Sequence, residues 1–120
     1  MKTALVLGAA GFIGHHLVRR LKSEGFWVRG VDKNIPPYRP TLADDFQMRD
    51  LRDPDEALES LAMQQPFDEV YQLAADMGGA GFIFSGDNDA EIMRNSASIN
   101  LNVLEAAHRF GAGRIFFSSS

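Results

Sequence analysis

Short apolar runs alternate with longer amphipathic stretches along the chain. The apolar runs predict strands, because a strand buried on both faces of a parallel sheet is apolar along its length. These runs are Thr3–Leu7, Phe26–Val31, Phe46–Met48, Phe67–Leu73 and Arg114–Phe117. Helical spacing of apolar residues predicts helices over Phe12–Ser23, from Asp53-Pro54 to Ala62, and from about Ala90 to Phe110. Strands and helices therefore alternate, which is typical of an α/β fold with a parallel sheet flanked by helices.

Residues with known preferences at helix ends support these boundaries. Gly25 and Gly111 are expected helix stops, and Asp53 is an expected cap before Pro54. Either Asp87 or Asp89 is expected to cap the last helix. The apolar face predicted for that helix consists of Met93, Ala97, Leu101, Leu104, Ala107 and His108. For the first helix it consists of Ile13, Leu17, Val18 and Leu21. The proline-rich stretch after residue 32 predicts a loop inside one domain.

Composition narrows the function classes. The chain has 120 residues, 45% of them hydrophobic, and a formal net charge of -4. This acidic balance argues against nucleic acid or a membrane surface as the main partner. The absence of cysteine excludes disulfides and thiolate zinc sites, and it fits a cytoplasmic protein. No metal site is predicted, because adjacent His15 and His16 would point about 100° apart on a helix.

The stretch "GAAGFIG" follows a predicted strand and opens a predicted helix. Gly8 would permit the tight turn, Gly11 would let backbone approach a pyrophosphate, and Gly14 would let the helix pack against the strand. Free N–H groups and the helix dipole at that end favour a phosphate pair. The motif therefore predicts a dinucleotide site in a Rossmann-type sheet. The alternative is a turn whose glycines serve packing alone.

An acidic residue stands where the second predicted strand ends. A carboxylate at Asp32 would accept hydrogen bonds from the adenosine ribose and repel a 2′-phosphate, which favours NAD over NADP. Lys33 beside it could tolerate a phosphate. The alternative for Asp32 is a solvated acid at the start of a loop.

Several segments together resemble the extended short-chain dehydrogenase/reductases, the NAD-dependent epimerase/dehydratase family. They are "GAAGFIGHHL", "MRDLRD", "LAA" and "NVLEAAHRFGAGRIFFSSS", in this order along the chain. The resemblance implies contacts to NAD from the first-turn residues Phe12 and Ile13. It also implies that Asp50 binds the adenine amine, that Leu51 packs on the adenine, and that Asn95 approaches the nicotinamide. Leu73, Ala74 and Ala75 would form the floor beneath the cofactor, and Ser120 would be a catalytic-site serine.

The stretch "LAADMGGAGF" resembles a narrower group in that family, the GDP-mannose 3,5-epimerases. The resemblance implies that Gly78 contacts the sugar of a GDP-hexose. It also implies transient oxidation at C4 and proton exchange at C3 and C5. These glycines could instead form a flexible connector. Another nucleotide-sugar 4-epimerase, 4,6-dehydratase or reductase, and a non-catalytic NAD-binding module, remain alternatives.

The family's catalytic Tyr-x-x-x-Lys pair is not found in this sequence. Leu42 stands four positions after Tyr38, and Ala75 stands four positions after Tyr71. The resemblance places that pair and the substrate domain after Ser120. Residues 1–120 are therefore interpreted as the N-terminal part of an NAD-binding Rossmann domain, inactive alone and homodimeric when full length.

Overall fold

The strands of this protein form one parallel sheet with helices on both sides. The computed structural model describes residues 1–34, 41–74 and 86–118. Its elements are β1 (Thr3–Leu7), α1 (Phe12–Ser23), β2 (Trp27–Asp32), β3 (Asp45–Met48), α2 (Pro54–Leu61), β4 (Glu69–Gln72), α3 (Gly86–Phe110) and β5 (Arg114–Phe117). The sheet has the order β3-β2-β1-β4-β5, and every neighbouring pair is parallel. The predicted Rossmann-type fold is confirmed.

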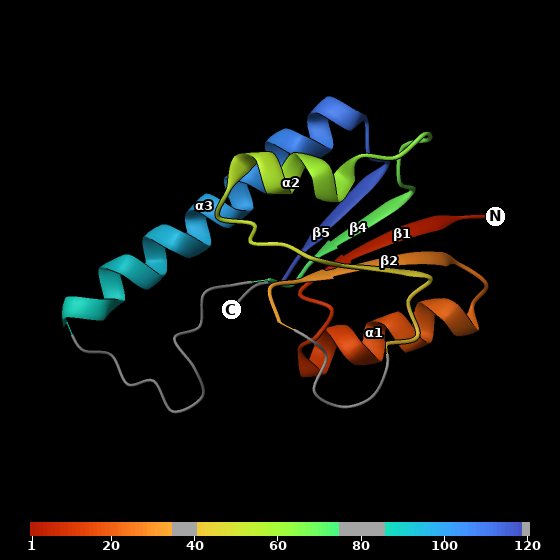
Figure 1. The fold of residues 1–120 in the computed structure, drawn as a ribbon, viewed down its shortest axis with the longest axis horizontal. Coiled ribbons are helices and arrows are strands. Elements are labelled where there is room, and N and C mark those ends of the chain that lie inside the picture. The colour runs from red at the N-terminus through yellow and green to blue at the C-terminus, as the bar shows by residue number, and fades with distance from the viewer. Residues whose placement is uncertain (35–40, 75–85, 119–120) are drawn as a thin grey trace.

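The two faces of the sheet are covered by different helices (Figure 1). On one face, Ala4 and Val6 of β1 pack with Val18 and Leu21 of α1. On the other face, Leu5 and Leu7 belong to a cluster that includes α2 and α3. Successive side chains of a strand point to opposite faces, so a strand covered on both sides must be apolar throughout. This explains why "TALVL" shows no polar alternation.

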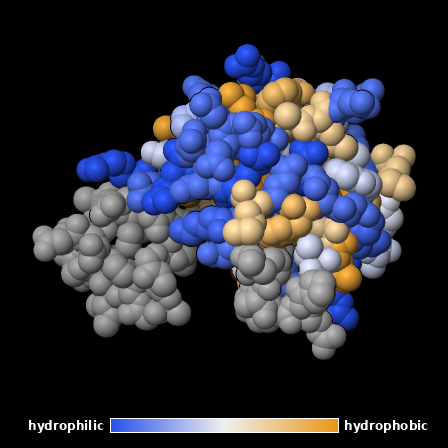
Figure 2. Space-filling view, viewed as in Figure 1, coloured by the Kyte–Doolittle hydropathy of each residue, from blue (hydrophilic) through white to orange (hydrophobic). Residues whose placement is uncertain are grey.

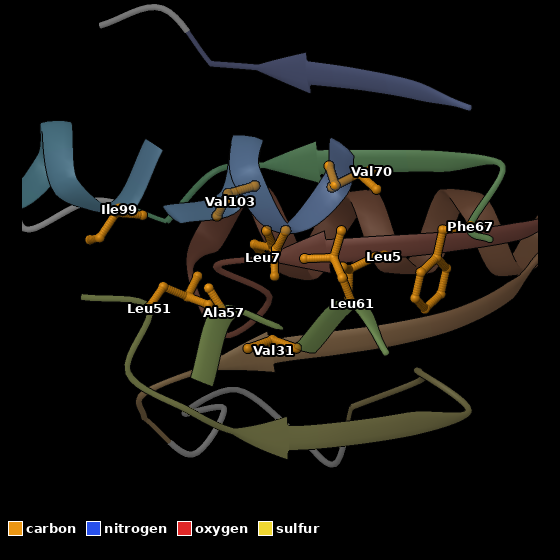
Figure 3. Close-up of a cluster of buried hydrophobic side chains, with 12 residues drawn as sticks. Leu5, Leu7, Val31, Leu51, Ala57, Leu61, Phe67, Val70, Ile99 and Val103 are labelled. Atoms are coloured by element: carbon orange, nitrogen blue, oxygen red, sulfur yellow. The ribbon is translucent and has the colours of Figure 1, made fainter. Parts of the chain in front are cut away.

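The larger core cluster lies between the sheet and the pair α2–α3 (Figure 3). It joins residues of three strands, both helices and two loops: Leu5, Leu7, Val31, Leu51, Ala57, Leu61, Phe67, Val70, Ile99, Val103, Ala106 and Ala107. Helix α2 begins as expected, because the Asp53 side chain accepts a hydrogen bond from the Asp55 amide and Pro54 occupies its first turn. Gly25 and Gly111 have positive φ angles of 89° and 77° just after α1 and α3. Both are the helix stops that the sequence predicts.

The predicted apolar face of α3 is wrong except at Ala107, which is buried. Leu101 and Leu104 are 63% and 49% exposed, and His108 and Ala97 are exposed as well. The buried face carries Ile99, Val103 and Ala106 together with Ala107. Both sets have helical spacing, so periodicity alone does not distinguish them. The small side chains of Ala106 and Ala107 suit the close approach of α3 to α2, and Leu101 and Leu104 are left outside the core.

Some predicted boundaries also need correction. Helix α3 begins at Gly86, so Asp87 and Asp89 lie inside it and neither is its cap. Strand β4 begins at Glu69 rather than Phe67, although the Phe67 side chain is still buried ahead of it. Strand β2 runs from Trp27 to Asp32, one residue later than predicted at each end, and β3 begins one residue earlier, at Asp45. On α1, Ile13 is exposed rather than part of the apolar face.

Hydrophobic residues also appear at the surface. Figure 2 shows them in several groups among hydrophilic residues on the face that it presents. The most exposed large ones on α3 and β5 are Leu101, Leu104, Phe116 and Phe117. No helix in the described ranges has the length and apolar character needed to cross a bilayer.

Tyr71 provides a pH-dependent probe of the sheet. Its ring stacks on Phe116 of the neighbouring strand, with centroids 4.8 Å apart, and its hydroxyl donates to a Glu69 carboxylate oxygen at 2.6 Å. Burial, and then this hydrogen bond, raise the pKa of Tyr71 to about 12 from its usual 10.0. The folded state therefore favours the neutral phenol.

We expect this pair to make stability fall at alkaline pH. A raised folded-state pKa contributes stability that is complete below the unfolded value near pH 10 and is lost as the pH rises toward 12. Urea unfolding at pH 9, 10, 11 and 12 should show this loss in the wild type and a smaller loss in Tyr71→Phe. Identical pH profiles of the two proteins would contradict the prediction.

Candidate functional site

The predicted cofactor-binding segments converge at one edge of the sheet. In register, Leu7 pairs with both Val31 and Gln72, and Asp32 pairs with Met48. Because all strands are parallel, the segments after β1, β2, β3 and β4 emerge side by side at their carboxyl ends (Figure 1). The direction of strand order reverses beside β1, with β2 on one side and β4 on the other. Open α/β sheets bind ligands at such a reversal.

Two glycines make the turn between β1 and α1 compact. Gly8 has a φ of 90°, and its amide and that of Ala9 both donate to the Val31 carbonyl, at 2.7 and 3.1 Å. A Cβ on Gly8 would lie 2.8 Å from the Ala74 nitrogen, and one on Gly14 would lie 2.1 Å from the Gly8 oxygen. Both contacts are with backbone, which cannot move aside as a flexible side chain can. The turn therefore requires glycine at both positions.

The start of α1 has the properties of an anion site. Gly11 is the residue before the helix and has no side chain to cap it, and the first turn contains no acidic residue. The first N–H groups of a helix lack intrahelical partners, and the dipole makes that end positive. Among described residues, a Cβ on Gly11 would meet only the Gly8 oxygen, at 3.5 Å. Phe12 and Ile13 are exposed beside it. This end therefore fits a pyrophosphate approaching the backbone.

Asp32 lies against the glycine turn. One carboxylate oxygen accepts from the Ala10 amide at 2.9 Å, and the other accepts from the Asn34 amide at 3.1 Å. The half-buried side chain is thereby oriented by backbone on both sides. Each carboxylate oxygen keeps a further acceptor position for a ribose hydroxyl. Lys33 beside it is exposed.

Gly30, in the middle of β2, is a site-supporting residue that sequence reasoning missed. A Cβ there would lie 2.9 Å from the Ala9 Cβ and 3.1 Å from a Phe46 ring carbon. The glycine thus makes room for the turn that carries Ala9. A glycine inside an apolar strand is the signal that could have identified it, because it often marks a close approach of another segment.

Asp50 and Leu51 follow β3. The Arg52 guanidinium binds both Asp50 carboxylate oxygens, at 2.6 to 3.1 Å, and lowers the pKa of Asp50. An adenine amine would therefore meet an ionised carboxylate already oriented by Arg52. The Leu51 side chain is only 4% exposed and lies beside Ala57 in the core (Figure 3). Any contact with an adenine would thus involve only the edge of this side chain.

Leu73 and Ala74 follow β4 and are held by a residue that the sequence did not single out. Gln72 is 2% exposed, and its side-chain amide both donates to the Ala74 carbonyl, at 2.7 Å, and accepts from the Ala74 amide, at 3.2 Å. It also donates to the Asn100 side-chain oxygen of α3 at 3.0 Å. The Leu73 amide continues the ladder to the Leu7 carbonyl at 2.8 Å. The backbone of Ala74 is therefore fixed next to Gly8.

The remaining predicted site residues divide into two groups. Asn95 is half-buried on α3. Ala75, Gly78 and Ser120 lie outside the described residues. The structure thus brings together the glycine turn, Asp32, Lys33, Asp50, Leu51, Leu73 and Ala74 at one edge of the sheet.

Comparisons with known proteins agree with this arrangement. GDP-mannose 3,5-epimerase 1 of Oryza sativa subsp. indica is 44% identical over 117 residues, which cover 96% of this chain and 30% of that protein. A crystal structure of UDP-galactose 4-epimerase superposes with a TM-score of 0.77 at 29% identity, covering 98% of this chain and 38% of the other. A mutant of uronate dehydrogenase from Agrobacterium tumefaciens, complexed with NAD, has a TM-score of 0.73 at 27% identity and covers 100% and 41%.

The family assignment rests on a match over nearly the whole chain. The chain spans about a third of the length of these relatives. The pattern of the NAD dependent epimerase/dehydratase family matches residues 4–120, nearly the whole chain. Its cofactor, NAD, fits the turn, the helix end and the carboxylate described above. The chain therefore belongs to the NAD dependent epimerase/dehydratase family.

Proposed function

We propose that the full-length protein is an NAD-dependent nucleotide-sugar epimerase that resembles the GDP-mannose 3,5-epimerases and acts on a GDP-hexose. The observation that carries this proposal is the 44% identity to the rice GDP-mannose 3,5-epimerase, against 29% to the UDP-galactose 4-epimerase of known structure. In this proposal the full-length protein is cytoplasmic, binds the nucleotide sugar and forms a dimer with a second copy of itself.

The residues of this chain serve mainly to hold the cofactor in place. When bound, NAD supplies the hydride acceptor that allows C4 of the sugar to be oxidised to a carbonyl. A carbonyl at C4 makes the neighbouring C–H groups acidic. The N–H groups at the start of α1 bind the pyrophosphate, Asp32 binds the adenosine ribose, and Asp50 binds the adenine amine. The cofactor lies against the backbone of Leu73, Ala74 and Ala75, and Asn95 approaches its nicotinamide end. Holding cofactor and sugar in register lowers the entropic part of the barrier.

In the same proposal, two residues outside the described ranges contact the sugar. Ser120 hydrogen-bonds the reacting C4 oxygen and stabilises charge there, and Gly78 contacts the hexose through its backbone. The resemblance of "LAADMGGAGF" and of the terminal serines supports these two assignments.

Incubation with GDP-mannose in D₂O tests the proposal. We expect the full-length protein to introduce deuterium at C3 and C5 of the hexose, read by NMR, because each epimerisation removes a carbon-bound proton and returns one from solvent. The 120-residue chain alone is expected to show no turnover. A C4 epimer without solvent deuterium at C3 and C5, or a 4-keto-6-deoxy product, would identify the corresponding alternative activity. Oxidation of added NADH or NADPH by a 4-keto nucleotide sugar would identify a reductase. NAD binding without turnover of any nucleotide sugar would identify a non-catalytic module.

A further inference from the structure

One side chain on α3 holds the segment that carries Asp50. Asn102 is half-buried, and its side-chain nitrogen donates to the Leu51 carbonyl at 3.0 Å and to the Arg52 carbonyl at 3.2 Å. The two carbonyls belong to consecutive residues about fifty positions earlier in the chain. These two hydrogen bonds therefore tie the segment after β3 to helix α3.

The two carbonyls are those of the central residues of a tight turn. The Asp53 amide donates to the Asp50 carbonyl at 3.1 Å and closes the turn around Leu51 and Arg52. Inside the turn, the Arg52 amide donates to the Asp50 carboxylate at 3.0 Å. The orientation of that carboxylate thus depends on the orientation of the turn peptides, and Asn102 binds both of these peptides.

The Leu51 side chain also secures the same turn. It is buried in the core among residues of α2 and α3, including Ala57 and Ile99. A buried side chain alone leaves the peptide planes some freedom to rotate. The two hydrogen bonds from Asn102 restrict that freedom, because rotation of either peptide would break one of them, and the bond to the Leu51 carbonyl is partly buried.

We infer that Asn102 is a positioning residue for the adenine end of the cofactor site: it holds the turn Asp50–Asp53 so that the Asp50 carboxylate faces the adenine amine. This inference rests on the proposed role of Asp50 in binding NAD. Asn102 does not touch the cofactor and acts through Asp50.

A second asparagine on α3 provides a matched comparison. Asn100 lies two positions earlier, and its side-chain oxygen accepts from Gln72, which holds Ala74 after β4. Neighbouring asparagines on one helix therefore hold two different segments of the site. Loss of Asn100 should affect the segment after β4, and loss of Asn102 should affect the adenine end.

The test compares NAD with nicotinamide hypoxanthine dinucleotide, in which a keto oxygen replaces the adenine amine. Calorimetric titration of the full-length wild-type protein should show tighter binding of NAD, because the Asp50 carboxylate accepts from an amine but repels a keto oxygen. In Asn102→Ala we expect NAD affinity to fall about tenfold while affinity for the hypoxanthine analogue changes little. Asn100→Ala should retain the wild-type ratio of the two affinities. Asn102→Gln, which keeps the amide donor, should restore part of the ratio.

The outcomes separate this inference from the proposed function. An Asn102→Ala protein that folds and retains the wild-type ratio would overturn the inference while NAD binding stands. Equal binding of both dinucleotides by the wild type would overturn the inference together with the proposed contact between Asp50 and the adenine amine, while NAD binding itself stands. A wild-type protein that binds neither would overturn both. If Asn102→Ala does not fold, Asn102→Ser serves instead, because its hydroxyl is too short to reach both carbonyls, and the same loss of ratio is expected.

Discussion

Replacement of Gly14 by alanine is expected to destabilise the fold severely and abolish NAD binding. The new Cβ would lie 2.1 Å from the Gly8 carbonyl oxygen and 2.9 Å from the Ala9 Cα. Helix α1 could accept it only by moving away from β1, which would open the core between Val18 and Val6. Overpacking against backbone on this scale should lower the free energy of unfolding by about 3 kcal/mol or more. Urea denaturation measures the first effect and calorimetric titration with NAD the second.

Gly11→Ala is the matched control, because its new Cβ meets the Gly8 oxygen at an ordinary 3.5 Å. Its φ of −74° suits alanine. We expect the free energy of unfolding to stay within about 1 kcal/mol of the wild type, while NAD affinity falls because a methyl group stands where backbone meets the pyrophosphate. A Gly14→Ala protein with wild-type stability would contradict the packing argument. A Gly11→Ala protein with wild-type NAD affinity would contradict the phosphate assignment.

Asp32→Asn is expected to weaken NAD binding and relax the rejection of NADP. Asparagine keeps the shape and one oxygen acceptor for the backbone amides that orient this side chain, but it loses the charge. Hydrogen bonds to a charged acceptor contribute about 1.5–3 kcal/mol, so NAD affinity should fall roughly tenfold to a hundredfold. NADP affinity should rise, because its 2′-phosphate no longer meets a carboxylate. Titration of the full-length protein with both dinucleotides gives the two affinities.

Two further variants complete this experiment. Asp32→Ala should have the same direction of effect and a larger loss of NAD affinity, since it also releases the Ala10 amide. Lys33→Ala in the Asp32→Asn background should reduce the gain in NADP affinity if Lys33 accommodates the phosphate. An unchanged preference between NAD and NADP in Asp32→Asn would contradict the ribose assignment.

The sequence predicted those parts of the site in which one residue's chemistry and its neighbours along the chain are sufficient. The spacing of Gly8, Gly11 and Gly14 between a strand and a helix predicts a phosphate-binding turn, because the turn is a local conformation. Asp32 was predicted in the same way, since the end of the second strand can be read from its apolar run. The family resemblance then indicated Asp50 and Leu73–Ala74.

Residues that support the site through contacts distant in sequence could not be found in this way. Gln72 and Asn102 are ordinary polar residues of a strand and a helix until the fold brings Ala74 and the turn after β3 within reach of them. Arg52 was seen only as part of a motif, but it neutralises the Asp50 carboxylate and orients it. Leu51 was expected on the adenine, and the fold uses most of its side chain in the core.

By itself, the sequence determined the order of strands and helices along the chain, the glycine turn and the acid at the end of β2. These features depend on periodicity and local backbone preference. Only the tertiary structure decided which face of α3 is buried. Two stripes with helical spacing compete on that helix and share Ala107, and packing against α2 and the sheet buries the stripe that carries Ile99, Val103 and Ala106. That choice turns Asn100 and Asn102 toward the two segments that they hold, since side chains on one helix keep fixed directions relative to one another.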